Sequence, residues 1–143
     1  MSSQRSLIAS VKARIVGSSV SGIAVVSPVS ISFLGDVDRT SGNIIAPENP
    51  LYGVSIAGKV LVTERTRGST VGAYILYALA KRGKAPRAIV VSKPDPVIIA
   101  GAVISGVTYV YNMPREILKI VRCGDLIEID AERGEVKVWR EGS

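Results

Sequence analysis

The stretch "VTERTRGSTVGAYILYALAKRGKAPRAIVVS", Val62 to Ser92, decides the fold, because it joins two apolar runs through one amphipathic segment. The apolar residues of that segment recur at the spacing of one helical face: Val71, Tyr74, Ile75, Ala78 and Leu79. Gly83 suits the left-handed position just after a last helical turn. The stretch therefore predicts a strand, a helix over residues 69–82 and a second strand. This succession predicts a right-handed crossover and a parallel strand pair, which is typical of an α/β fold.

Short strands and turns are predicted on both sides of this unit, since Gly and Pro together account for 21 of the 143 residues. Strands are expected at residues 12–17, 21–27, 27–35, 58–64, 86–92 and 107–112, and a hairpin at residues 125–139. Asp95 and Pro96 predict the N-cap and first position of a second helix that ends near Gly106, and residues 114–121 are short helix or extended chain. The long loop at residues 35–50 and the turn at Lys93–Asp95 are candidate walls of a site.

The length and composition indicate one globular domain over residues 1–143, with 47% apolar and 21% charged residues. The longest largely apolar stretch, Val97 to Val107, has 11 residues, against the roughly 20 that a bilayer span requires. The N-terminal segment lacks the apolar core of a secretory signal. A soluble cytoplasmic protein without a membrane partner is expected.

The chain contains no histidine and one cysteine, Cys123. These counts exclude an internal disulfide, a Cys/His metal site and a Ser-His-Asp triad. We therefore expect the chain to hold no metal of its own.

The formal net charge of +6 is compatible with a nucleic-acid surface or with an anionic small molecule. The one dense basic cluster ends the predicted helix and complements its dipole: Lys81, Arg82, Lys84 and Arg87. With one Phe and one Trp, the chain has little material for stacking bases. We expect no nucleic-acid partner, although a non-catalytic basic module that binds nucleic acid or phosphorylated ligands remains an alternative.

Gly68-Ser69-Thr70 precedes the predicted helix, where free N–H groups and the helix dipole form an anion site. The segment is neither a Walker A loop nor a nucleophile elbow, because Arg67 and Val71 occupy the positions where the elbow needs glycines. Most serines in this pattern are helix N-caps that contribute about 1 kcal/mol. From the residues alone, Ser69 is either such a cap or a group that takes part in chemistry.

Four blocks, spread in order from about Ile15 to Val138, resemble the small subunit of the aconitase X family. They are "SISFLGDVDRTSGNI", "NPLYGVSIAGKVLV", "RGSTVGAYILYAL" and "GKAPRAIVVSKPDPVIIAGAVISG". The resemblance implies a single swivelling β/β/α domain like the mobile C-terminal domain of aconitase. It also implies a partner, a larger subunit that carries an iron–sulfur cluster of the 4Fe-4S type, with which the chain forms a heterodimer or larger assembly.

The resemblance further implies a hydro-lyase of the archaeal mevalonate route to isoprenoids. In that branch of the family the substrate is a phosphorylated hydroxy acid, (R)-5-phosphomevalonate, and the product is trans-anhydromevalonate 5-phosphate. Ser69 matches the serine that acts as general base in aconitases, while the iron of the partner takes the substrate hydroxyl. Gly68, Thr70 and Arg67 are the implied substrate-binding residues.

The chain departs from the aconitase pattern at Val71, where aconitases have an arginine that binds a substrate carboxylate. Citrate or isocitrate recognition is therefore not expected. A hydroxyproline is an alternative substrate, because other aconitase X members dehydrate hydroxyprolines. Asn49 stands where relatives often have histidine, and we assign it no role from the sequence.

Overall fold

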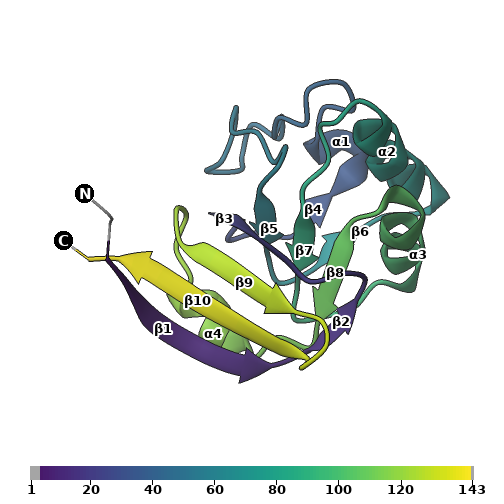
Figure 1. Ribbon diagram of the computed structural model, residues 1–143. Helices are drawn as coiled ribbons and strands as arrows, with labels where there is room; N and C mark the ends of the chain where they lie inside the picture. Colours follow the sequence, from purple (N-terminus) through teal and green to yellow (C-terminus); the bar gives the residue numbers. More distant parts are fainter. Residues whose placement is uncertain (1–3, 143) are drawn as a thin grey trace.

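The computed structural model describes residues 4–142 as an α/β fold (Figure 1). Its strands are β1 (Arg5–Lys12), β2 (Arg14–Val16), β3 (Val20–Val26), β4 (Ile31–Ser32), β5 (Val60–Val62), β6 (Thr66–Arg67), β7 (Ala88–Val90), β8 (Thr108–Tyr111), β9 (Leu126–Asp130) and β10 (Glu135–Glu141). Its helices are α1 (Phe33–Asp36), α2 (Thr70–Lys81), α3 (Pro96–Ser105) and α4 (Arg115–Ile120). The predicted order of strand, helix and strand over residues 62–92 is confirmed.

Four parallel strands form the centre of the main sheet, in the order β3-β5-β7-β8. Their apolar runs are continuous because both faces of the strands are buried. In β5, for example, Val60 and Val62 face one hydrophobic cluster while Leu61 faces the other. The parallel pairing of β5 and β7 that the sequence predicts is confirmed.

The sheet curls back on itself, because the consecutive strands β1 and β2 lie at its two opposite edges. β1 lies antiparallel to β10, and β2 lies antiparallel to β8, yet Ala13 alone separates β1 from β2. The predicted hairpin is confirmed as β9–β10, which joins β3 through β9. In Figure 1 the hairpin and β1 lie on the opposite side of the molecule from α2 and α3.

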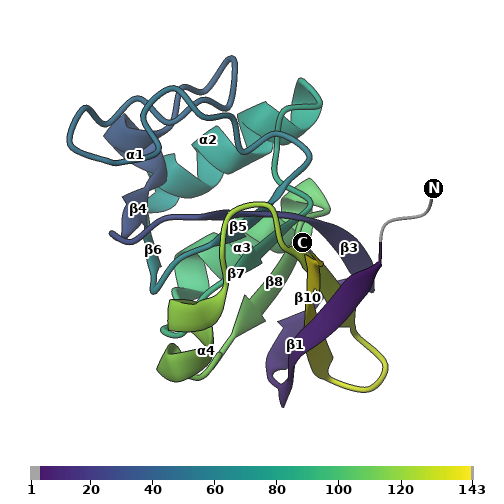
Figure 2. The ribbon, with the colours of Figure 1, turned by 90° about the vertical axis from the view of Figure 1, so that its left-hand side faces the viewer.

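Two hydrophobic layers result from this curl. The inner layer lies inside the curled sheet and combines the parallel strands with Ile127, Ile129, Val136 and Val138 of the hairpin. The outer layer lies between the parallel strands and the helices, with Leu76 and Leu79 of α2 and Ile98 of α3 fully buried. Figure 2 shows α1 and α2 on one side of the parallel strands and α4 on the other side. Ile117 and Leu118 of α4 pack against the inner layer.

A buried ion pair fixes the beginning of the hairpin. Asp125 is 3% exposed and accepts hydrogen bonds from Arg140 Nε at 2.9 Å and from an Arg140 terminal nitrogen at 2.8 Å. Burial disfavours its carboxylate, but the bonds from Arg140 and from the Arg122 N–H outweigh this effect, so the pKa of Asp125 lies below its ordinary value. The Asp125 carbonyl also accepts from the Ala24 N–H, which ties the hairpin to β3.

Two sequence predictions need correction. The expected strand at residues 27–35 shortens to β4, because Asp36 accepts from the Ser32 N–H at 2.7 Å and Gly35 takes a left-handed φ of 97°. These local side-chain bonds and the glycine turn end the extended chain in spite of its alternating pattern. The expected strand at residues 12–17 is β2, preceded by the longer β1, which the sequence did not indicate.

Candidate functional site

The helices α2 and α3 begin at the same end of the sheet, beyond the carboxyl ends of β5 and β7. Each has the N-cap that the sequence predicts. Ser69 Oγ accepts from the Val71 N–H at 3.2 Å, and an Asp95 carboxylate oxygen accepts from the Val97 N–H at 3.0 Å. In open α/β sheets this is the edge at which ligands bind.

Close packing fixes the loop that carries Ser69. A Cβ added to Gly68 would lie 2.5 Å from Ile98 Cδ1 and 3.3 Å from Gly72 Cα, so only glycine fits without displacing the buried Ile98 side chain. The loop therefore packs against both α2 and α3, while Ser69 itself is exposed to solvent.

The implied binding residues lie next to Ser69 in one segment. Arg67 is the exposed end of β6, which pairs in parallel with β4 and brings Ser32 opposite Arg67. Thr70 is the first residue of α2 and is exposed. The structure therefore brings Arg67, Gly68, Ser69 and Thr70 together at one helix end, although their roles remain predictions.

The turn at Lys93–Asp95 leads into α3 and is held by two hydrogen bonds, while its role as a wall of the site stays a prediction. The Lys93 N–H donates to the Glu64 carbonyl at 3.0 Å, and the Asp95 N–H donates to the hydroxyl of Tyr109 at 3.2 Å. Burial raises the pKa of Tyr109 above its ordinary value, so the hydroxyl that supports this turn stays protonated.

The loop at residues 35–50 reaches both ends of α2. A Cβ on Gly42 would lie 2.8 Å from the Lys84 carbonyl oxygen, so the middle of the loop covers the end of α2 away from Ser69. Its last residues return to the carboxyl end of β3, where Asn49 donates to Ser27 Oγ at 3.1 Å.

Asn49 has a structural role that the sequence did not reveal. Its side chain is 3% exposed, and besides its bond to Ser27 it accepts from the Leu51 N–H at 2.8 Å. Ser27 and Thr63 both donate to the Val29 carbonyl. Ser27 and Thr63 also line a cavity of about 410 Å³, and so do Glu64 and Arg115, which form an ion pair at 2.8 Å.

Nothing in residues 4–142 forms a metal centre, since no three His, Cys, Asp or Glu side chains gather there. Cys123 is exposed and accepts from the Val26 N–H at 3.2 Å. These donors do not fit an iron–sulfur cluster. In the same residues no helix is long and apolar enough to cross a membrane.

The curled sheet with helices on its outer face has the architecture that is expected of a swivel domain. The family model for the aconitase X swivel domain matches residues 10–138. The chain therefore belongs to the aconitase X family, and the expected swivelling β/β/α fold is confirmed.

Named relatives and a solved structure agree with this assignment. The phosphomevalonate dehydratase small subunit of Pyrococcus horikoshii is 45% identical over 87% of this chain and 90% of its own length. That of Pyrococcus abyssi is 44% identical over 83% of this chain and 89% of its own length. The crystal structure of Thermococcus kodakaraensis aconitase X in its holo-form aligns with a TM-score of 0.84, at 39% identity, over 91% of this chain and 98% of that one.

Proposed function

We propose that the chain is the small subunit of a dehydratase that converts (R)-5-phosphomevalonate to trans-anhydromevalonate 5-phosphate. The relatives at 41–45% identity that carry the corresponding name support this function over nearly their whole length. No specific observation favours the alternatives, a subunit for a hydroxyproline or a basic binding module.

The observation that carries the catalytic role is the position of Ser69. Its hydroxyl is exposed at the first turn of α2, where the Val71 N–H points at the oxygen. A negative oxygen at that point is stabilised by the N–H group and by the positive end of the helix dipole. Ser69 therefore takes the proton from the carbon next to the substrate carboxylate. The electrons of the broken C–H bond form the double bond as the C–O bond breaks, and the hydroxyl leaves as hydroxide. Return of the proton from Ser69, directly or through solvent, converts the hydroxide to water and regenerates the base.

Arg67 and Thr70 flank the base and have the chemistry to hold the anionic substrate. Arg67 carries a fixed positive charge on a short strand, and Thr70 adds a hydroxyl and an N–H group at the helix end. An exposed site of this kind needs a partner to exclude water. We assign that part, and the iron–sulfur cluster, to a large subunit with which this chain assembles.

The test uses three variants of Ser69 in the complex with the large subunit. Ser69→Ala removes both the cap and the base, so we expect about 1 kcal/mol lower stability and a loss of turnover of about 10²–10⁴-fold. Ser69→Asn keeps a capping oxygen but has no hydroxyl, so its stability stays near that of the parent while turnover falls equally. Ser69→Thr keeps both groups and retains measurable turnover.

The assay follows loss of 5-phosphomevalonate under anaerobic conditions, with each chain alone as the control. Normal turnover in Ser69→Asn would mean that Ser69 is only a helix cap. An assembled complex that leaves 5-phosphomevalonate unchanged but dehydrates a hydroxyproline would overturn the substrate and keep the reaction class.

A further inference from the structure

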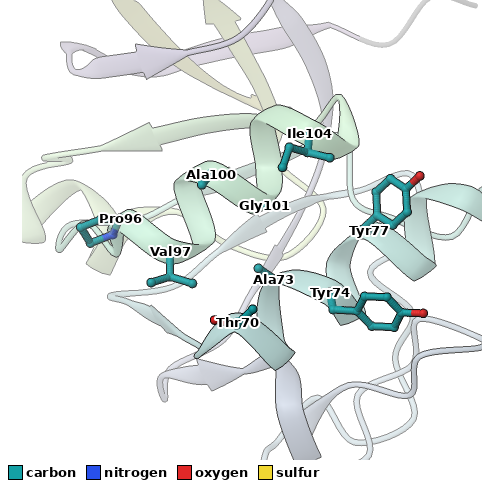
Figure 3. A pocket seen from close by; sticks show the side chains of 9 residues that line it. All are labelled: Thr70, Ala73, Tyr74, Tyr77, Pro96, Val97, Ala100, Gly101 and Ile104. Carbon is teal, nitrogen blue, oxygen red and sulfur yellow. The ribbon is translucent and has the colours of Figure 1, made fainter.

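An apolar groove runs along the outer surface between α2 and α3. Its volume is about 640 Å³. Both helices line it: Thr70, Ala73, Tyr74 and Tyr77 belong to α2, and Pro96, Val97, Ala100, Gly101 and Ile104 belong to α3. Figure 3 shows Ala73 and Gly101 between the helices, with the tyrosines on one side and Val97 and Ile104 on the other. Its floor is thus made of small residues and its walls of large ones.

The walls of the groove expose large apolar side chains. Ile104 is 71% exposed and Tyr74 is 63% exposed. Tyr77 and Val97 are 36% and 40% exposed, so large apolar side chains stand along both walls. A contiguous exposed apolar surface rimmed by polar residues is typical of interaction sites.

The groove is uncharged, although the chain as a whole carries a net charge of +6. None of the nine residues that line it in the described part of the chain is acidic or basic. Lys81, one turn beyond Tyr77, lies with its Nζ 5.8 Å from the centre of the Tyr77 ring at the end of the groove. An occupant that fits this surface is an apolar segment without charges.

One end of the groove is the site itself. Thr70 both lines the groove and follows Ser69, and Pro96 follows the cap of α3. Any chain that closes over Ser69 therefore also lies at the open end of the groove. The contact area beside Ser69 adds to that of the groove in one continuous surface.

We propose that the α2–α3 groove is the docking surface for the large subunit, which inserts an uncharged apolar segment between Tyr74 and Ile104. This inference rests on the proposed function, because the site needs a chain of different composition to complete it. A second copy of this chain fits that need less well, since its described residues bring no metal-holding group to Ser69. Docking in the groove would hold α2, and with it Ser69, against the partner.

The test measures assembly alone, so that it does not depend on the reaction. Ile104→Glu and Tyr74→Glu place a charge on opposite walls of the groove, at positions exposed enough to leave the fold intact. Leu7→Glu is the matched control, because Leu7 is 48% exposed on β1, which lies on the other side of the molecule (Figure 1). The affinity of each full-length variant for the purified large subunit from the same genome is measured by calorimetry without substrate.

We expect both groove variants to bind at least 100-fold more weakly than the parent, and Leu7→Glu to bind within about twofold of it. Circular dichroism checks that all three variants are folded. Unchanged affinity in both groove variants would overturn the inference. It would also be overturned if the isolated chain is a dimer that Ile104→Glu dissociates while binding to the large subunit is kept. Because the binding assay contains no substrate, its result can be interpreted even if the complex does not dehydrate 5-phosphomevalonate.

Discussion

Replacing Gly101 with alanine tests whether the spacing of α2 and α3 is set by one glycine. The new Cβ would lie 2.8 Å from Ala73 Cβ and 3.1 Å from Ala73 Cα, whereas carbon atoms at rest lie about 3.5–4.0 Å apart. Since the obstacle includes the backbone of α2, the helices would have to separate by several tenths of an ångström. Such overpacking costs about 1–3 kcal/mol.

The gain in helix propensity offsets part of this cost. Alanine favours a helix over glycine by about 1 kcal/mol, so Gly101→Ala should lower the free energy of unfolding by roughly 1 kcal/mol net. Gly72→Ala is the matched control, because Gly72 lies in the facing helix and its added Cβ would meet nothing closer than 3.6 Å. That variant should gain about 0.5–1 kcal/mol. The two substitutions are therefore expected to have opposite signs.

Guanidinium unfolding, followed by far-ultraviolet circular dichroism, measures both variants against the parent. Ala73→Gly removes the 2.8 Å contact but not the one at 3.1 Å, and by itself costs about 1 kcal/mol of helix propensity. The relief of the contact should therefore appear as a double variant that is more stable than the sum of the two single changes predicts. The packing argument is refuted if Gly101→Ala is as stable as Gly72→Ala.

Two further predictions concern the loop before α2 and the hairpin. Gly68→Ala should reduce turnover of the complex severalfold and stability by about 1–2 kcal/mol, because its Cβ would displace the buried Ile98. Adding Ile98→Val removes the Cδ1 atom at 2.5 Å and should restore much of both the turnover and the stability. No recovery in the double variant would contradict the packing account. Asp125→Asn should cost about 2–3 kcal/mol, less than a fully buried pair because Arg140 keeps a quarter of its side chain exposed. The lowered pKa of Asp125 stabilises the fold above the unfolded value of about 3.9 and ceases to do so as the pH falls through the folded value. Urea titrations between pH 2 and 6 should therefore show a shallower pH dependence in the variant, and equal slopes would contradict this.

Local signals were enough to predict the central part of the fold. The cap at Ser69, the glycine after α2, the Asp95-Pro96 start of α3 and the alternating hairpin all depend on residues within one turn of each other. The propensities that decide such features act over a few positions, so they can be read from a single sequence. The parallel pairing followed from the connection rule.

Contacts between distant residues could not be predicted in this way. The strand β1 consists mostly of exposed residues and exists because β10, more than 120 positions later, pairs with it. Likewise, nothing near Asn49 signals that Ser27 will meet its side chain, and the sequence left Asn49 without a role. The close contact of Gly101 with Ala73 depends on the crossing of two helices, which no spacing within either helix reveals.

At the site, the sequence placed Ser69, Gly68, Thr70 and Arg67 in one segment, and the fold keeps them at one helix end. The groove beside them was missed, because Tyr74 was counted on the apolar face of the helix and no pattern singled out Tyr77 or Ile104. Tyr74 has the spacing of the core residues but is 63% exposed. Exposure of this kind depends on which neighbours cover a helix, and the sequence contains no direct record of that.

β1 pairs with β10 from Arg5 opposite Glu141 to Lys12 opposite Glu135. This pairing also determines when the sheet can close during synthesis. During synthesis β1 leaves the ribosome before the other described strands, whereas its partner β10 emerges after all of them. Until then β1 and β9 expose unpaired edges that can join other nascent chains. The curl of the sheet therefore closes only after translation has passed Glu141, and until then the inner hydrophobic layer lacks the hairpin side chains that complete it.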